Sequence, residues 1–404
     1  MSETNRFAAL PGSPFPRLNA LLDGIAPGRP PMLMSLGEPQ HPFPEFVTRV
    51  LAENAAGFGK YPPIAGTEAF REAAAGWLER RFALPAGTLD RETQILPANG
   101  TREALFHLAQ VAVPTEKAGE RPTILMPNPF YQCYAAAALA AGAEPVYVSA
   151  TAESGHLPDY EALPEELLAR TAVIYFCSPA NPQGACASRD YLQRLIALAR
   201  RHDILLAIDE CYADIYDRDA PAGALEVAHA MAEGEGDERD FARNIVVFHS
   251  LSKRSSLPGL RSGFCAGERS FMSRFRAYRN VAAPQVPLPI QAASAAAWAD
   301  DAHADANRAL YVKKIDMAER LIGNRFGFYR PAGGFFLWLD VGDGEAAARD
   351  LWAKAGVKVL PGAYLSRPDA TLPEGNPGAR YIRVALVGDE ASTEEALTRM
   401  AEIL

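Results

Sequence analysis

The sequence has few of the features that mark metal-binding, disulfide-bonded or membrane proteins. Its five cysteines are an odd number without a Cys-X-X-Cys pair, and its seven histidines include no His-Glu-X-X-His pattern. Neither a disulfide framework nor a metal site is therefore expected. Two long stretches, 122–143 and 281–299, are nearly uncharged, but both are rich in alanine and broken by prolines. A membrane span needs about 20 strongly apolar residues, so both stretches predict buried segments of a globular protein.

The charge balance and the first residues exclude two further classes of protein. The net charge is −9, and a phosphate backbone would be repelled by it. No basic run or helix-turn-helix pattern is present, so nucleic-acid binding is not expected. The first 18 residues lack the basic start and apolar core of a signal peptide. We therefore expect a cytoplasmic protein with free thiols.

A length of 404 residues predicts two domains. Between residues 93 and 279, short apolar runs alternate with helical stretches at 102–111, 160–168 and 191–201. The apolar runs, which we expect to form buried strands, are 94–97, 123–127, 145–149, 173–178, 204–209, 245–250 and 263–267. This alternation predicts an α/β fold with a mainly parallel sheet covered by helices on both faces. The acidic segment 231–240 reads as a loop, and the chain from about residue 302 reads as a smaller α+β domain.

A lysine follows the apolar run 245–250. Lys253 is flanked by the hydroxyls of Ser250 and Ser252, and Arg261 lies a few residues further along, between two glycines. Hydroxyls and a guanidinium together can bind a dianion, and arginine does so through two hydrogen bonds. The segment fits a lysine that bonds covalently to a phosphate-bearing cofactor. A surface lysine in a serine-rich loop is the alternative.

A second candidate, Asp209, ends the apolar run 204–209. A bare carboxylate there would be costly unless it is paired. It can pair with a protonated pyridine nitrogen, which keeps the ring electron-poor so that it accepts carbanion charge. Tyr212 lies three residues on and could reach a hydroxyl of the same ring. The alternative is an aspartate that caps a helix.

Three weaker motifs follow other strands. The turn 178–184 contains two prolines and a glycine and could aim the amide of Asn181 at a ligand, although a plain turn would look similar. Gly100 precedes a predicted helix whose backbone N–H groups could bind phosphate, with an ordinary helix cap as the alternative. Tyr131 could stack on a flat ring, although core packing is the more common role of a single aromatic residue.

Together these segments resemble the signature set of the fold-type I, class I/II aminotransferases. The resemblance runs from about residue 35 to the C-terminus, in the order and approximate spacing of that family. It implies the fold-type I architecture, with a seven-stranded sheet, and pyridoxal phosphate (PLP) as the cofactor. By position, Lys253 resembles the lysine that holds PLP covalently and Asp209 the partner of the pyridine nitrogen. Tyr212 and Asn181 resemble the ligands of the ring hydroxyl.

The same resemblance implies the remaining site residues. The residues that match the phosphate site are Gly100, Thr101, Arg102, Ser250, Ser252 and Arg261. Tyr131 matches the stacking aromatic, and Tyr61 the tyrosine that each subunit of a homodimer lends to its neighbour's phosphate. Arg383 matches the arginine that clamps the substrate α-carboxylate, with Gly37 and Asn181 nearby. The implied domains are an N-terminal segment (1–35) that packs with the small domain, a large PLP-binding domain (36–295) and a small domain (296–404).

Longer strings, including Leu36-Gly-Glu-Pro-Gln-His-Pro and Leu360-Pro-Gly-Ala-Tyr-Leu-Ser, resemble the proteobacterial succinyldiaminopimelate aminotransferases. The implied reaction moves an amino group between N-succinyl-LL-2,6-diaminopimelate and 2-oxoglutarate, in lysine and diaminopimelate biosynthesis. Gln183 and the segment 280–287 depart from the expected pattern. Arg17 and Arg29 are the candidates for the distal carboxylate of the donor.

Other functions stay open at this point. The same set of residues suits an aminotransferase for aspartate, aromatic or N-acetylornithine donors, or a PLP-dependent C–S β-lyase. A non-catalytic regulator on this fold would need a DNA-binding extension, and at most about 35 residues precede the resemblance, which is short for a domain.

Overall fold

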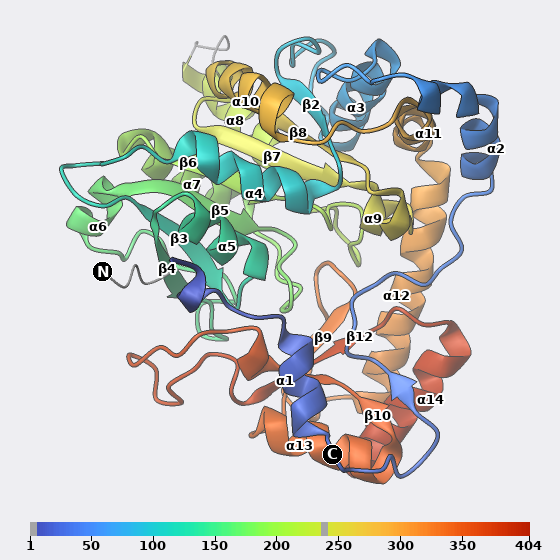
Figure 1. Cartoon of the computed structure of the whole chain (residues 1–404). Helices are drawn as coiled ribbons and strands as arrows, with labels where there is room; N and C mark the ends of the chain where they lie inside the picture. Colours follow the sequence, from blue (N-terminus) through green and yellow to red (C-terminus); the bar gives the residue numbers. More distant parts are fainter. Residues whose placement is uncertain (1–5, 236–240) are drawn as a thin grey trace.

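The computed structural model describes residues 6–235 and 241–404 of the chain. Figure 1 shows a large body built on a twisted sheet and a smaller body below it, with the long helix α12 (Ala302–Ile322) reaching from one to the other. Among the described residues, the structure contains no helix whose length and hydropathy would let it cross a membrane.

The central sheet has seven strands in the order β2-β8-β7-β6-β5-β3-β4. Their bounds are Ile95–Ala98 (β2), Thr123–Asn128 (β3), Glu144–Ser149 (β4), Thr171–Cys177 (β5), Leu205–Asp209 (β6), Ile245–Ser250 (β7) and Gly263–Gly267 (β8). Strand β8 runs antiparallel to β2 and β7, whereas the other pairings are parallel. The predicted α/β fold with a mainly parallel seven-stranded sheet is therefore confirmed.

Helices cover both faces of this sheet. Their bounds are Phe46–Glu53 (α2), Glu68–Arg81 (α3), Thr101–Ala112 (α4), Gln132–Ala140 (α5), Glu165–Ala169 (α6), Arg189–Arg201 (α7), Ala224–Glu235 (α8), Leu251–Arg254 (α9), Arg269–Ala282 (α10) and Leu288–Ala299 (α11). Two short 3-10 helices, η2 (Ala55–Gly59) and η4 (Pro258–Leu260), lie between them. One core lies between the sheet and α3, α7, α8 and α11, and a second lies between the sheet and α4, α5 and α10.

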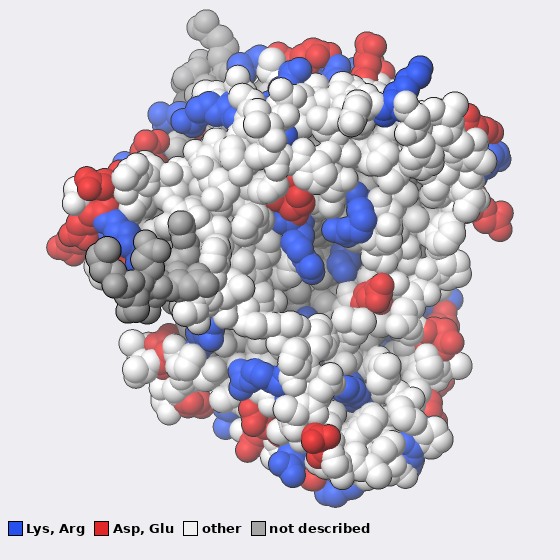
Figure 2. Space-filling view, in the orientation of Figure 1, with Lys and Arg blue, Asp and Glu red and all other residues white. Residues whose placement is uncertain are grey.

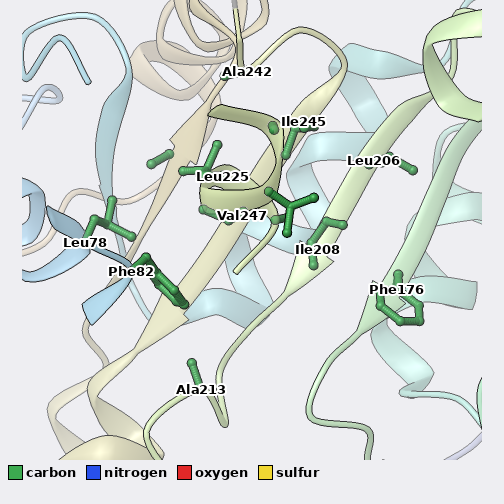
Figure 3. Packing of buried hydrophobic residues seen from close by; sticks show 14 of the residues in the cluster. Leu78, Phe82, Phe176, Leu206, Ile208, Ala213, Leu225, Ala242, Ile245 and Val247 are labelled. Carbon is green, nitrogen blue, oxygen red and sulfur yellow. The ribbon is translucent and has the colours of Figure 1, made fainter. Parts of the chain in front are cut away.

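The period of two along each strand explains why there are two cores. On β6, Leu206 and Ile208 belong to the first core, whereas the alternating residues Leu205 and Ala207 belong to the second. Figure 3 shows Leu206, Ile208, Ile245 and Val247 together with Leu225 of α8. Because both faces are covered, the strands read as continuous apolar runs, and this made them recognisable in the sequence.

The smaller body combines both ends of the chain. Its elements are α1 (Pro14–Leu21), β1 (Met32–Leu33), α12, β9 (Phe336–Asp340), α13 (Gly344–Asp350), the π-helix η5 (Leu351–Ala355), β10 (Val357–Lys358), β11 (Leu360–Pro361), η6 (Gly362–Tyr364), β12 (Tyr381–Ala385) and α14 (Glu390–Ile403). The short 3-10 helix η1 (Arg6–Ala9) lies against α5 of the large body instead. The antiparallel sheet β11-β12-β9 and the parallel pair β1-β10 surround one apolar core with α12 and α14.

The division into 1–35, 36–295 and 296–404 stays a prediction, and residues 1–5 of its first unit lie outside the described residues. Helix α11 contacts α2 and α3 along its length and therefore lies with the large body. We propose residue 300, between α11 and α12, as the boundary.

Two local predictions are wrong. The helix expected over 160–168 begins only at Glu165, because Asp159 forms a turn by accepting the amides of Glu161 and Ala162, both at 3.2 Å. The acidic loop expected over 231–240 is helical as far as Glu235, and its remaining residues 236–240 lie outside the described chain.

Candidate active site

A cavity of about 550 Å³ opens where the carboxyl ends of β5, β6 and β7 face β9 and β12 of the smaller body. Figure 2 shows a hollow near the middle of the molecule, with Lys and Arg gathered around it. Twelve of the residues expected in the site line this cavity: Gly37, Thr101, Arg102, Tyr131, Asn181, Asp209, Tyr212, Ser250, Ser252, Lys253, Arg261 and Arg383.

Lys253 lies on α9, the short helix that follows β7. Its Nζ donates a hydrogen bond of 2.8 Å to the backbone oxygen of Gly37 and lies 5.4 Å from the ring centre of Phe335. Burial lowers the pKa of Lys253 to about 8. A lysine of this kind has an appreciable neutral fraction near neutral pH, so its amine can act as a nucleophile and as a base.

Asp209 ends β6 and lies beneath the cavity. Its Oδ2 accepts the hydroxyl of Tyr134 at 2.8 Å, and its Oδ1 accepts the amide of Cys211 at 3.3 Å. Burial raises the pKa of Asp209, and these hydrogen bonds oppose the shift. Asp209 forms no salt bridge with any described residue, so a cation that enters the cavity above it would complete its pairing.

The N-terminus of α4 provides a site for an anion. Gly100 precedes this helix with φ +75°, and no side chain caps the first turn. A Cβ at Gly100 would lie 2.3 Å from Nη2 of Arg261, so only glycine permits the guanidinium to lie here. Arg261 is held by the backbone oxygens of Pro258 at 3.0 Å and Asn99 at 3.3 Å. Free N–H groups, a guanidinium and the nearby serine hydroxyls together suit a phosphate dianion.

Tyr131 and Arg102 form one wall of the cavity. The Tyr131 hydroxyl accepts a hydrogen bond from Nε of Arg102. The neighbouring Thr101 hydroxyl lies 3.0 Å from the sulfur of Cys211, on the loop that follows Asp209. This hydrogen bond links the start of α4 to the end of β6.

Arg383 on β12 forms the opposite wall. Its Nη1 donates to Oδ1 of Asn181 at 3.1 Å, and its Nη2 donates to the backbone oxygen of Ser35 at 2.8 Å. Burial lowers the pKa of Arg383 to about 10, so it stays charged at neutral pH. Its buried Nε has no partner among the described residues. The side chain therefore keeps an unused donor for a carboxylate.

Phe336 shapes the wall beside this arginine. The guanidinium carbon of Arg383 lies 4.4 Å from the ring centre of Phe336. A Cβ at Gly37 would lie 2.6 Å from the same ring, so the glycine lets the segment 35–38 pass close to it. Gly37 thus contributes a backbone oxygen to Lys253 and space to Phe336.

Two of the expected residues do not line the cavity. Gly100 lies just behind it, against Arg261. Tyr61 is 98% exposed and lies on the surface. Phe58 and Val281 are also largely exposed, at 62% and 88%. Val281 belongs to the segment 280–287, which departs from the pattern of the succinyldiaminopimelate aminotransferases. The Tyr61 side chain therefore does not reach the cavity that the described residues form.

The candidates for the distal carboxylate are also elsewhere. Arg17 lies over the ring of Tyr364, and Arg29 pairs with Glu402 at 2.8 Å. Neither lines the cavity. Gln183 does not line it either. This residue is buried, and its backbone oxygen accepts a hydrogen bond of 2.6 Å from the Tyr329 hydroxyl.

Tyr134 and Cys211 are site residues that the sequence did not reveal. Tyr134 is fully buried on α5, and its ring stacks on that of Tyr175 at 4.7 Å. A buried tyrosine in an alanine-rich helix reads as core. Its place one helical turn after Tyr131 is the signal that points it toward the same site.

The family model for aminotransferase class I and II matches residues 29–400. The chain belongs to this family. One aminotransferase relative, the 4-dedimethylamino-4-oxo-anhydrotetracycline transaminase OxyQ of Streptomyces rimosus, is 32% identical over 91% of this chain and 92% of its own. LL-diaminopimelate aminotransferase 2 of Trichormus variabilis is 29% identical over 100% and 98%. An aminotransferase structure from Neisseria meningitidis is 36% identical, with a TM-score of 0.91 over 98% of each chain.

Class I and II aminotransferases depend on PLP, and this chain is a PLP-dependent aminotransferase. The cavity fits the group in two respects that the geometry shows independently. The uncapped start of α4, with Gly100 and Arg261, suits the phosphate. The buried Asp209, which has no salt bridge to a described residue, suits the protonated pyridine nitrogen.

Proposed function

We propose that this aminotransferase moves an amino group between N-succinyl-LL-2,6-diaminopimelate and 2-oxoglutarate. The observation that carries the proposal is the resemblance of the segments 36–42 and 360–366 to the succinyldiaminopimelate aminotransferases, and relatives named for LL-diaminopimelate support the same class of donor. Four cationic residues line the cavity, Arg102, Lys253, Arg261 and Arg383, with the carboxylates of Glu38 and the buried Asp209. Of the four, Arg383 is the one that remains for a carboxylate of the donor once the cofactor is bound.

The proposed cofactor-binding roles follow from the positions described. Lys253 would hold PLP covalently, Asp209 would pair with the pyridine nitrogen, and Asn181 and Tyr212 would bind the ring hydroxyl. Tyr131 would stack on the ring. The residues proposed for the phosphate are Gly100, Thr101, Arg102, Ser250, Ser252 and Arg261. When bound, PLP supplies an electron-poor ring that stabilises negative charge at the carbon from which a proton is removed.

The chain's own residues would then orient the substrate and move a proton. Arg383 would bind the α-carboxylate with the help of Asn181 and Gly37, and a charge-assisted bond of this kind contributes about 1.5–3 kcal/mol. The amine of Lys253, with its pKa lowered to about 8, would remove the proton from the substrate α-carbon and return it to the C4′ carbon of the cofactor. Phe336 and the segment 35–38 would exclude water from the same region.

A homodimer is part of this proposal. The side chain of Tyr61 is almost fully exposed, as is that of Val281, and Phe58 is largely exposed. A second chain packed on this surface would remove these side chains from water. A second copy would let Tyr61 reach the phosphate site of its neighbour. Analytical ultracentrifugation of the wild type and Tyr61→Phe would show a dimer for both, with weaker PLP binding by the variant. A monomeric wild type would contradict the proposal.

A coupled assay tests the substrate. Glutamate release would be followed with 2-oxoglutarate and one of four donors: N-succinyl-LL-diaminopimelate, LL-diaminopimelate, aspartate or N-acetylornithine. The second donor is included because relatives carry its name. The succinylated donor is expected to give the highest kcat/KM, and Lys253→Ala should be inactive with every donor. A preference for LL-diaminopimelate would replace the substrate and keep the aminotransferase. Pyruvate release from cystathionine without an oxo acid would indicate a β-lyase.

A further inference from the structure

A chain of buried polar side chains lies behind the lysine of the cavity. Helix α12 carries two of its members, Asn307 and Lys314, which are 8% and 0% exposed. Between them lies His41, four residues after Gly37 in the sequence. His41 Nδ1 lies 2.7 Å from Oδ1 of Asn307, and its Nε2 lies 2.6 Å from Nζ of Lys314. None of the three residues lines the cavity.

The direction of these hydrogen bonds follows from what each group can donate. An ammonium has three donors and no acceptor, and Lys314 places them on His41 Nε2, the Leu386 oxygen at 2.8 Å and the Gly388 oxygen. His41 Nε2 is therefore the acceptor. Burial lowers the pKa of His41, so the ring is neutral at neutral pH and carries its proton on Nδ1. That proton is donated to Asn307.

Asn307, at the other end of this series of side chains, binds the backbone of the catalytic lysine. Nδ2 of Asn307 donates to the backbone oxygens of Lys253 and Arg254, both at 3.0 Å. Helix α9 has only four residues, so its last carbonyl groups have no partner in a following turn. Asn307 therefore acts as the C-terminal cap of the helix that carries Lys253.

Lys314, at the first end of this series of side chains, contacts the segment that follows the proposed substrate-binding strand. Leu386 and Gly388 directly follow β12, the strand that carries Arg383. The Leu386 amide also donates to the backbone oxygen of Phe335 at 2.9 Å, and the ring of Phe335 lies beside Nζ of Lys253. Strand β12 and helix α9 are thus connected through side chains that belong to α12 and to the segment after Gly37.

We propose that Lys314, His41 and Asn307 are positioning residues, which form a relay that holds Lys253 in a fixed relation to the strand of Arg383. The inference rests on the proposed roles of Lys253 and Arg383. Arg383 determines where the substrate α-carbon lies, and the lysine amine must meet a proton on that carbon. An error of about 1 Å in such a geometry can lower a rate about 100-fold.

Three substitutions break the relay at different links and keep much of the packing. Lys314→Met removes the three donors of the ammonium group. His41→Phe removes the ring nitrogens but keeps a ring against Tyr311, whose ring centre lies 4.3 Å away. Asn307→Leu removes the cap of α9. The control is Ile315→Ala, which creates a cavity in the core of the smaller body next to Lys314 and leaves the relay intact. The control lowers Tm without changing the position of α9.

The first readout uses the PLP-loaded enzyme with its best donor. Each relay variant is expected to lower kcat about tenfold and to change KM less than twofold, because the α-carboxylate site stays in place while the base is displaced. The pH midpoint at which the visible absorbance of bound PLP changes should differ between each relay variant and both the wild type and the control. The double variant Lys314→Met/Asn307→Leu should be no worse than the poorer single variant, because the links act in series.

The second readout needs neither PLP nor substrate. Hydrogen exchange would follow the amides of Ser255 and Leu257, which donate to the Leu251 oxygen at 3.1 and 3.3 Å and report on α9. Exchange should be about fivefold faster in Asn307→Leu than in Ile315→Ala. Relay variants that match the control in both readouts, or losses that add in the double variant, would overturn the proposal. A wild type without transaminase activity would instead overturn the proposed function, and the exchange result would still stand.

Discussion

The hydrogen bond from Tyr134 to Asp209 gives the sharpest prediction. Tyr134→Phe removes one oxygen from a fully buried side chain, and the remaining ring keeps its stacking contact with Tyr175. The lost bond measures 2.8 Å and ends on a carboxylate, whereas the Cys211 amide lies further away, at 3.3 Å. A bond to a charged group contributes about 1.5–3 kcal/mol, so the variant should lose that amount of unfolding free energy near neutral pH.

The pH dependence has a definite sign. Burial already raises the pKa of Asp209, and loss of the hydroxyl raises it further. The folded protein then holds a proton that the unfolded chain has released, so stability falls as the pH rises from the ordinary carboxyl pKa through the raised one. Below that window the carboxyl is protonated in both states, and the variant should approach the wild type.

Urea denaturation of the PLP-free proteins from pH 4 to pH 8 measures this difference. In the loaded enzyme, a more basic Asp209 competes with the pyridine nitrogen for its proton, and kcat should fall about tenfold. Tyr175→Phe is the control, since its hydroxyl donates to the Leu105 oxygen at 2.6 Å, away from the carboxylate. A loss for Tyr134→Phe that is constant with pH would refute the reasoning, because the hydroxyl would then not act through the charge of Asp209.

Three further predictions concern the cavity walls. Lys253→Met should stabilise the PLP-free protein at pH 7, because the folded state lowers the pKa of this lysine to about 8. The gain in unfolding free energy should fade in denaturation curves recorded from pH 8 to pH 10.5, because the lysine then loses its proton in the unfolded protein as well. Arg383→Lys should raise the KM for every amino donor about tenfold in steady-state assays, because lysine cannot bind a carboxylate through two parallel hydrogen bonds. Gly100→Ala should weaken PLP binding about tenfold in a fluorescence titration, since its Cβ would lie 2.3 Å from Nη2 of Arg261. Gly87→Ala is the control, because Gly87 also has a positive φ but has no neighbour within 4 Å of the added Cβ. This control should bind PLP like the wild type.

The sheet could be predicted because its strands are buried on both faces. Strands β7 and β8 agree with the apolar runs to the residue, and the boundaries of the other strands differ from the predicted ones by at most two residues. Asp209 and Lys253 could be found for the same reason. Asp209 is the last residue of one run and Lys253 lies three residues after another, and the carboxyl ends of parallel strands meet at one edge of the sheet.

The remaining features depend on contacts that no local pattern records. Tyr134 looks like any core aromatic until Asp209, 75 positions away, is placed beside it. His41 and Lys314 are 273 positions apart, and their pairing follows only from the path of α12 between the two bodies. Arg29 does not line the cavity and pairs with Glu402, 373 positions away, a contact that no local pattern predicts.

The origin of the two cavity walls has a consequence for how new activities could arise. The groups that this chain would offer to its own cofactor come from the central sheet and its loops, between residues 100 and 261, whereas Arg383, Phe336 and the segment 35–38 lie outside that interval. Mutations of the side chains of Leu36, Glu38 or Phe336 can reshape the space for the donor, while the backbone oxygen of Gly37 continues to accept a hydrogen bond from Lys253. Selection can therefore explore amino donors by changing the two ends of the gene, while the codons for residues 100–261 stay under a separate constraint.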